Sequence, residues 1–208
     1  MFQKIFNPDN ALMITMTQIT DCIFLSMFWM LGCFPVVTAG ASFAALYDAS
    51  FRTYRRGEKH SWQRFWKTFR TNLKDGILPT LIMIPAAYGL LRCLIAVWNA
   101  AVYGSISWVI FSAAALLIVT VFGVLCVLFP MLSRFQNSLG GLLKNTVLLA
   151  FANMPRTMGL GILNAAVLYL CVRFIVPLFF LPALAALISS LLIEPMFKPY
   201  MNEENAAV

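Results

Sequence analysis

Charge is scarce in this sequence. Only 11% of the 208 residues are Asp, Glu, Lys or Arg, there is one histidine, and eight acidic residues face 15 basic ones. Ordinary soluble domains carry about 25% charged and about 45–50% apolar residues, whereas this chain is 61% apolar with a mean hydropathy of +0.83. A soluble domain of this size could not bury so much apolar surface. The composition therefore predicts an integral membrane protein and excludes a disordered chain or a disulfide scaffold.

The motifs of common enzyme classes are also missing. The sequence has no Walker A motif and no HExxH, GxSxG or CxxC. Its five cysteines lie singly in apolar stretches, where a thiol behaves as a small hydrophobic group, so we assign no disulfide and no metal site. We expect no enzymatic activity, no catalytic residue and no cofactor. The membrane explains the net charge of +7 better than a nucleic acid partner does, because basic residues orient membrane spans.

Long apolar runs indicate the membrane-spanning helices. A helical span takes roughly 20 apolar residues, and residues 93–133 carry no charge at all. The pattern predicts an all-α, polytopic transmembrane bundle, a multi-pass protein of the cell membrane that forms a single domain over residues 1–208. The expected spans are 11–34, 76–98, 105–129, 157–172 and 174–193.

Residues 38–56 decide whether a sixth span exists. The segment is rich in small residues, and Ala41, Ala45 and Ala49 form a stripe that suits close helix packing in a membrane. If the segment crosses, both termini are cytoplasmic and all but two of the 15 basic residues lie on the cytoplasmic side, in agreement with the positive-inside rule. If it does not cross, five spans remain and the N-terminus lies outside. We favour six spans.

Two segments between the spans are expected to form amphipathic helices on the cytoplasmic side. In SWQRFWKTFRTNLKDG, aromatic side chains share one helical face, and basic side chains are available for the other. Such a helix suits the membrane surface, with its aromatic face among acyl chains and its cations near anionic headgroups. The second segment, residues 138–156, is less basic, and we expect it to dock under the bundle. The candidate lipid-interface residues are Trp62, Arg64, Trp66, Lys67, Arg70 and Lys74.

The chain also matches itself weakly at an offset of 81 residues. This offset predicts a possible parallel repeat of residues 38–92 and 119–173, each with an inward helix, an amphipathic segment and an outward helix. Three identities in an apolar chain can also arise by chance, so both interpretations stay open. The matching residues are Asn72, Tyr88 and Arg92 with Asn153, Tyr169 and Arg173.

Four charged residues within the predicted helices are candidate intramembrane ligand sites: Asp21, Asp48, Arg92 and Arg173. Asp21 lies near the centre of the first span, where a carboxylate marks an ion or proton pathway or is held by hydrogen bonds to neighbours. Asp48 and Arg52 have the spacing of a helical ion pair. Arg92 and Arg173 each lie ~25 Å along their helices, so that they either snorkel to the outer headgroups or bind an anionic ligand there.

Several stretches together resemble the YesL-like family of bacterial membrane proteins. They are the N-terminal FNPDN, the segment PVVTAGASFAALYDASFRTYR and the segment SWQRFWKTFRTNLKDG. The most specific part is residues 35–41 followed by Ala44-Ala45-Leu46-Tyr47. The family is a domain of unknown function whose members are commonly encoded beside carbohydrate-uptake genes. The resemblance therefore implies an accessory part in sugar import and supplies no catalytic residues.

Three functions remain open at this point. The absence of catalytic motifs and the resemblance favour an accessory or regulatory component of carbohydrate uptake, with transporter subunits as partners. Asp21 and the possible repeat favour a small solute transporter. The basic aromatic segment at residues 61–74 favours a lipid-binding scaffold or sensor that recognises anionic headgroups. A polar cavity that reaches Asp21 would favour transport, whereas a packed bundle would favour the accessory role.

Overall fold

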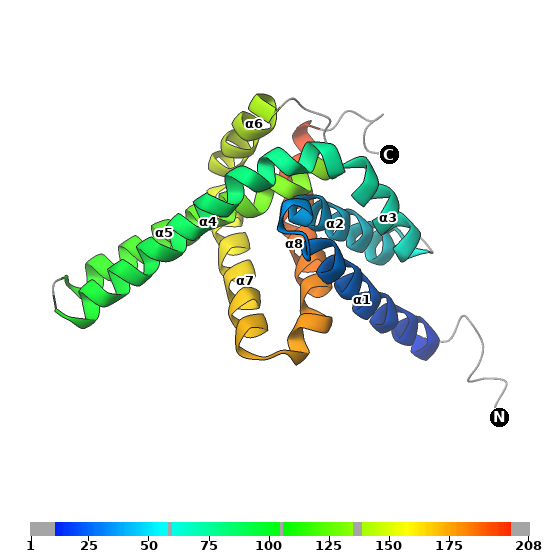
Figure 1. Ribbon diagram of the computed structural model, residues 1–208, viewed down its shortest axis with the longest axis horizontal. Coiled ribbons are helices and arrows are strands. Elements are labelled where there is room, and N and C mark those ends of the chain that lie inside the picture. Colours follow the sequence, from blue (N-terminus) through cyan, green and yellow to red (C-terminus); the bar gives the residue numbers. More distant parts are fainter. Residues whose placement is uncertain (1–10, 58–59, 105, 135–138, 201–208) are drawn as a thin grey trace.

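The computed structural model describes residues 11–57, 60–104, 106–134 and 139–200, and in this part of the chain the regular structure is helical throughout (Figure 1). The predicted all-α class is confirmed for these residues. The longest helices are α1 (Ala11–Cys33), α4 (Leu73–Val102), α5 (Trp108–Arg134) and α7 (Met154–Arg173). The shorter α-helices are α2 (Ala39–Arg56), α3 (Ser61–Thr71), α6 (Leu139–Ala152) and α8 (Leu181–Phe197), and the 3-10 turns are η2 (Val36–Thr38), η3 (Val176–Phe179) and η4 (Lys198–Tyr200).

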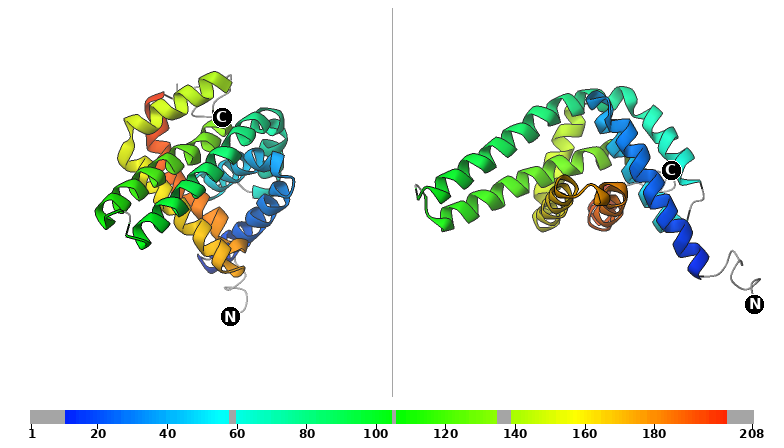
Figure 2. Two further views of the ribbon diagram at one scale, coloured as in Figure 1. Left: turned by 60° about the vertical axis from the view of Figure 1, so that its left-hand side comes forward. Right: turned by 60° about the horizontal axis from the view of Figure 1, so that its bottom comes forward.

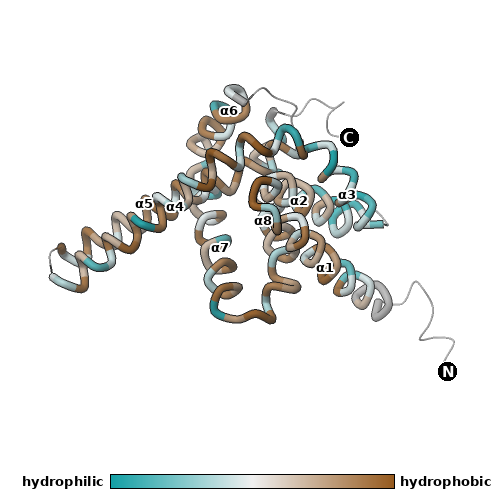
Figure 3. Tube along the Cα trace, viewed as in Figure 1, coloured by the Kyte–Doolittle hydropathy of each residue, from teal (hydrophilic) through white to brown (hydrophobic). Residues whose placement is uncertain are grey.

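The helices spread as three arms from a common junction. The α4–α5 hairpin forms the longest arm, the α7–α8 hairpin the second, and α1 the third, with α2 at the junction (Figures 1 and 2). Apolar residues cover the two hairpin arms, and hydrophilic residues gather on α3 (Figure 3). In α4 the only buried residues are Gly76, Pro79, Thr80 and Ala101, so most of its apolar side chains face outward. An apolar surface of this extent is typical of contact with a membrane.

Helix α2 is the most enclosed element of the described chain. Twelve of its 18 residues are buried, and it packs against α1, α3, α4, α5 and α8. Ala41, Ala45 and Ala49 are fully buried, so the stripe of small residues lies inside the protein and lets neighbouring helices approach closely. The helix ends at Gly57, whose φ of 68° places it in the left-handed region and whose N–H donates to the carbonyl of Arg52.

Two close helix crossings fix the arrangement of the arms. In the first, α2 crosses α4, and the Gly40 N–H donates to Thr80 Oγ1 at 3.0 Å. In the second, α5 crosses α7, and a Cβ added to Gly123 would collide with the carbonyl of Thr157. A Cβ on Gly40 would likewise collide with Thr80 and Phe129. Glycine is required at both crossings because no side chain fits between the backbones.

The same 81-residue offset relates these crossings. Gly76 and Thr80 on α4 correspond to Thr157 and Gly161 on α7 (157 − 76 = 81), and both pairs meet the preceding long helix. The connecting helices α3 and α6 end in the same way. Asn72 Nδ2 donates to the Thr68 carbonyl at 2.9 Å, and Asn153 Nδ2 donates to the Leu149 carbonyl at 3.3 Å. The backbone therefore repeats local contacts at the spacing seen in the sequence.

Four helices in the described part are long and apolar enough to cross a membrane: residues 16–33 of α1, and the helices α4, α5 and α7. This supports the membrane-protein class. Helix α8, with 17 residues, is a shorter apolar helix, and α2 carries Asp48 and three arginines. Because neither α2 nor α8 is among the candidate spans, the six-span count is not confirmed.

Candidate functional site

Asp48 is the centre of a buried ion-pair network. Its side chain is 2% exposed, and one carboxylate oxygen accepts a hydrogen bond from Arg52 Nε at 2.9 Å. The other oxygen accepts hydrogen bonds from Arg64 Nε and Thr68 Oγ1, each at 2.8 Å. Arg52 lies one turn further along α2, whereas Arg64 and Thr68 come from α3. The antiparallel packing of α3 on α2 therefore completes a carboxylate site that the Asp48–Arg52 spacing only begins.

The electrostatics of the network favour a charged Asp48. Burial alone would raise the pKa of this carboxyl, but the hydrogen bond and charge of Arg52, the charge of Arg64 and the hydrogen bond from Thr68 outweigh it. The pKa of Asp48 is consequently lowered from its ordinary value. Removing one member of such a buried pair leaves a charge without compensation, which is far more costly than losing an exposed pair.

A second network joins α2 to the ends of α5 and α8. Glu194 Oε1 accepts a hydrogen bond from Arg134 Nη2 at 2.7 Å and another from the Tyr47 hydroxyl at 3.1 Å. The guanidinium carbon of Arg134 lies 4.3 Å from the centre of the Phe51 ring, close enough for a cation–π contact. Tyr47 and Asp48 are consecutive residues, so one turn of α2 belongs to both networks.

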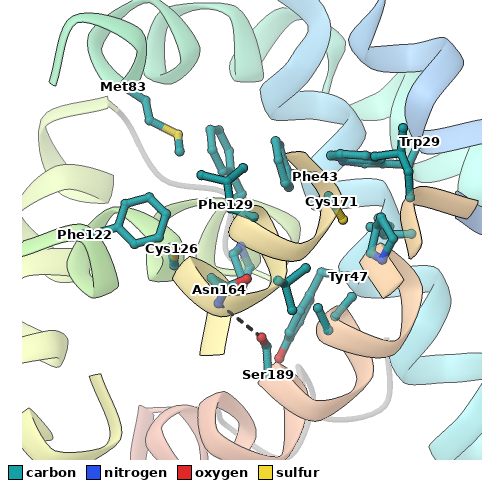
Figure 4. A pocket seen from close by; sticks show the side chains of 18 of the residues that line it. Trp29, Phe43, Tyr47, Met83, Phe122, Cys126, Phe129, Asn164, Cys171 and Ser189 are labelled. Carbon is teal, nitrogen blue, oxygen red and sulfur yellow. Dashed lines mark hydrogen bonds between the residues drawn. The ribbon is translucent and has the colours of Figure 1, made fainter. Parts of the chain in front are cut away.

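An apolar cavity of about 280 Å³ lies beside these networks (Figure 4). We call it the interhelical cavity. Side chains from α1, α2, α4, α5, α7 and α8 line it, and Figure 4 shows Phe43, Phe122 and Phe129 among them. Asn164 Nδ2 donates to the Leu160 carbonyl at 2.9 Å and to Ser189 Oγ at 3.5 Å, which leaves the polar lining groups engaged with protein. Tyr47 lines the cavity and thereby connects it to Glu194.

Asp21 lies outside the interhelical cavity. It is half-buried on α1, and its Oδ1 accepts a hydrogen bond from Ser61 Oγ, the first residue of α3, at 2.8 Å. Nearby, the Tyr54 hydroxyl donates to the carbonyl of Gln18 at 2.8 Å. The structure thus provides Asp21 with a partner from a neighbouring helix, and the cavity lining does not include it.

Arg92 and Arg173 are exposed and lie on different arms. Arg92 is on the outward-facing surface of α4, and Arg173 is the last residue of α7. The structure does not bring either of them into the Asp48 network or the lining of the interhelical cavity. Their exposure is compatible with the snorkelling that the sequence predicts.

The proposed lipid-interface residues of α3 divide into two groups. Arg64 binds Asp48, and Trp66 packs edge-on against Phe28 and Phe69 with ring centres 6.1 and 5.6 Å apart. Phe65 is fully buried on the same face, so part of the aromatic face contacts protein. Trp62 is 50% exposed. The remaining basic residues, Lys67, Arg70 and Lys74, are exposed as well.

Sequence reasoning missed the network of Arg134, Glu194 and Tyr47. Glu194 has the spacing of a helical pair with Lys198, and that pairing is the one considered from the sequence. In the structure Glu194 binds Arg134, 60 residues earlier in the chain. The available signal was the position of both residues at the ends of apolar runs, where a buried charge needs a partner.

Comparison with known proteins gives one match. Residues 10–92 match the model of a family described as "Protein of unknown function, DUF624". The matched region covers α1 from its start, α2, α3 and two thirds of α4, and it includes the complete Asp48 network. No curated protein and no solved structure matches the chain. The finer YesL-like assignment stays a prediction, and the match supports placing the N-terminal part of this chain in a domain family of unknown function.

Proposed function

We propose that this protein is a non-enzymatic membrane component that acts through a partner, as an accessory or regulatory subunit in carbohydrate uptake. One observation carries the accessory role: the buried carboxylates bind cations of the protein itself. Asp48 binds Arg52 and Arg64, and Glu194 binds Arg134. Charged groups held in this way stabilise a packed assembly and leave little free capacity for a polar solute. The link to carbohydrate uptake rests on the resemblance to the YesL-like family.

Co-purification from native membranes tests this proposal. The full chain, with a C-terminal affinity tag, is extracted in mild detergent and its partners are identified by mass spectrometry. We expect the permease subunits of a carbohydrate transporter in near-stoichiometric amount, and their absence from a parallel purification of an unrelated multi-pass protein. Recovery of the solitary protein would contradict the accessory role.

Reconstitution separates this role from transport by the protein alone. Purified protein in proteoliposomes is expected to give no sugar flux above that of empty vesicles. Flux that is present in the unaltered protein and lost in Asp21→Asn would instead support the small-transporter alternative. Asp75→Asn is the matched control, because Asp75 is an exposed carboxylate at the start of α4.

A lipid-binding role is a second candidate, favoured by the exposed part of α3. Trp62 is half exposed, and Lys67, Arg70 and Lys74 present positive charge beside it. An aromatic ring and several cations on one surface suit anionic headgroups. Replacing these three basic residues by Gln should weaken the association of the reconstituted protein with anionic lipid, and added salt should do the same. Lys144→Gln with Arg156→Gln is the control on the second connecting segment.

The membrane topology that we propose has five spans, α1, α4, α5, α7 and α8, with the N-terminus outside. The hydrogen bond between Gly40 and Thr80 supports it, because it puts the start of α2 beside the start of α4. In a six-span scheme these two ends would lie on opposite membrane faces. An epitope tag at the N-terminus should be accessible in intact spheroplasts. Accessibility only in inverted vesicles would restore the six-span scheme with both termini cytoplasmic.

We also propose that residues 38–92 and 119–173 are parallel repeats. The matched crossings of α2 with α4 and of α5 with α7 support this, as do the matched hydrogen bonds of Asn72 and Asn153. In each segment a helix passes the crossing, a shorter helix folds back along it, and the next long helix begins after an asparagine. Equal sensitivity of the two crossings to a methyl group would support the proposal.

A further inference from the structure

We infer that the interhelical cavity binds one hydrocarbon chain of a bilayer phospholipid. This site goes beyond the accessory role, and it does not depend on it. The inference rests on the chemistry of the lining, on the direction in which the cavity opens and on its size.

The lining of the cavity suits a hydrocarbon and not a sugar. Its side chains are mainly aliphatic and aromatic, from Phe122 and Phe129 on one side to Ala185 and Ala186 on the other. The few polar side chains have partners within the protein: the Asn164 amide donates to its own helix and toward Ser189, and Tyr47 donates to Glu194. A sugar would lose its hydrogen bonds to water in such a place without replacing them, which is costly.

The cavity opens toward the bilayer. Leu168 and Val172 line it from α7, and these side chains are also 59% and 82% exposed on the outer surface of the molecule. Helix α7 is one of the candidate membrane spans. Residues that belong both to the lining and to a lipid-facing surface mark a lateral entrance, through which a neighbouring acyl chain enters without crossing water.

The size of the cavity fits part of an acyl chain. Its volume of about 280 Å³ is nearly twice the roughly 150 Å³ of an engineered apolar cavity that stays free of water and binds benzene. An empty void of this kind deprives its lining atoms of van der Waals partners, and a flexible chain restores these contacts. The bilayer supplies phospholipid chains at the entrance in large excess over other apolar molecules.

The first test counts retained lipids. The purified full chain is analysed by native mass spectrometry in mild detergent, beside two cavity-filling variants, Ala185→Leu and Val167→Phe. Ala96→Leu is the matched control, because Ala96 is an exposed alanine on the outer surface of α4. We expect one retained phospholipid on the unaltered protein and on the control. Retention should fall about tenfold in the filled variants, as expected for the loss of 1.4 kcal/mol of binding free energy.

Each other outcome of this test contradicts the inference. Equal retention in all four proteins, or no retention in any of them, would remove the site. A free fatty acid mass would contradict the phospholipid source, and a lipid-free dimer would identify a second copy of the chain as the occupant. Circular dichroism and a monodisperse elution profile show whether each variant is folded.

A second test uses the unaltered protein and so avoids any folding defect. Phospholipid with a photoreactive diazirine in its acyl chain is incorporated into vesicles with the protein, and labelled residues are mapped after illumination. Surrounding lipid reaches only exposed side chains, whereas Phe129 is 3% exposed and lines the cavity. Labelling of Phe129 or Cys126 supports the inference. Labelling confined to exposed residues such as Val109 and Leu117, which are 75% and 65% exposed, would overturn it.

Discussion

The segment α2–α3–α4 and the segment α5–α6–α7 share a backbone pattern but differ in what fills it. Asp48 in the first corresponds to Phe129 in the second (129 − 48 = 81), and both are buried. The partners of Asp48 correspond to neutral residues: Arg52 to Ser133, Arg64 to Asn145 and Thr68 to Leu149. The first hairpin is therefore held by ion pairs and the second by apolar packing. Close backbone crossings at small residues are what the two segments have in common, so these crossings define the arrangement more than hydropathy does.

The largest expected effect would disrupt only the first segment. Asp48→Ala leaves Arg52 and Arg64 without their buried carboxylate, and such a loss costs about 3–5 kcal/mol. Thermal unfolding in detergent micelles measures it, and Asp75→Ala at an exposed site is the control. A change of less than 1 kcal/mol at Asp48 would show that the network does not hold α3 against α2.

The same carboxylate predicts how stability depends on pH. Because the pKa of Asp48 is lowered in the folded protein, its ion pairs stabilise the fold above the ordinary pKa of aspartate, about 3.9. This contribution is lost as the pH falls through the lowered pKa of the folded state. Unfolding temperatures between pH 7 and pH 2 should drop less steeply in Asp48→Asn than in the unaltered protein. Parallel curves would show that Asp48 does not carry this dependence.

Gly40→Ala and Gly123→Ala compare the two crossings directly. In each, the added methyl group meets a neighbouring helix and forces the backbones apart, and overpacking of this kind costs about 1–3 kcal/mol. Gly89→Ala on α4 meets open space, and we expect it to stabilise the helix by about 0.5–1 kcal/mol. Losses of similar size at residues 40 and 123 would strengthen the comparison. A loss at only one of them would break it.

Tyr47→Phe should have a smaller effect, because it removes one hydroxyl donor from Glu194 while the Arg134 pair remains. A hydrogen bond of this kind contributes about 1 kcal/mol. Chemical denaturation of the reconstituted protein would measure it. Tyr54→Phe, at a partly exposed hydroxyl that donates to the Gln18 carbonyl, is the control and should change stability less.

The smallest expected effect concerns the asparagines that precede α4 and α7. Asn72→Ala and Asn153→Ala each remove one side-chain hydrogen bond to the connecting helix. We expect a loss of about 0.5–1.5 kcal/mol in each case, somewhat larger at Asn72, whose bond is shorter. Hydrogen exchange at the ends of α3 and α6 would detect the loosening. Protection that changes at neither end would show that the shared asparagine contributes nothing to either turn.

The sequence was most informative where lipid contact selects the residues. Helices α4, α5 and α7 follow from their apolar runs because their side chains face outward, where hydrocarbon selects for apolar groups. The Asp48–Arg52 pair follows from helical spacing. Arg64 and Glu194, in contrast, find their partners only through the folding back of α3 on α2 and of α8 toward α5. The interhelical cavity is a gap between six helices, and such a gap depends on packing that no local pattern records.

Tyr47 forms part of the wall of the cavity and also touches the end of the chain. Its ring faces the apolar space, while its hydroxyl holds Glu194, the single acidic residue of α8. A guest that displaces this ring therefore pulls on the carboxylate that anchors the last helix to Arg134. Occupancy in the hydrocarbon layer and the position of the C-terminal helix are mechanically linked through one phenol, which gives the molecule a route for reporting its lipid surroundings to whatever binds its C-terminal end.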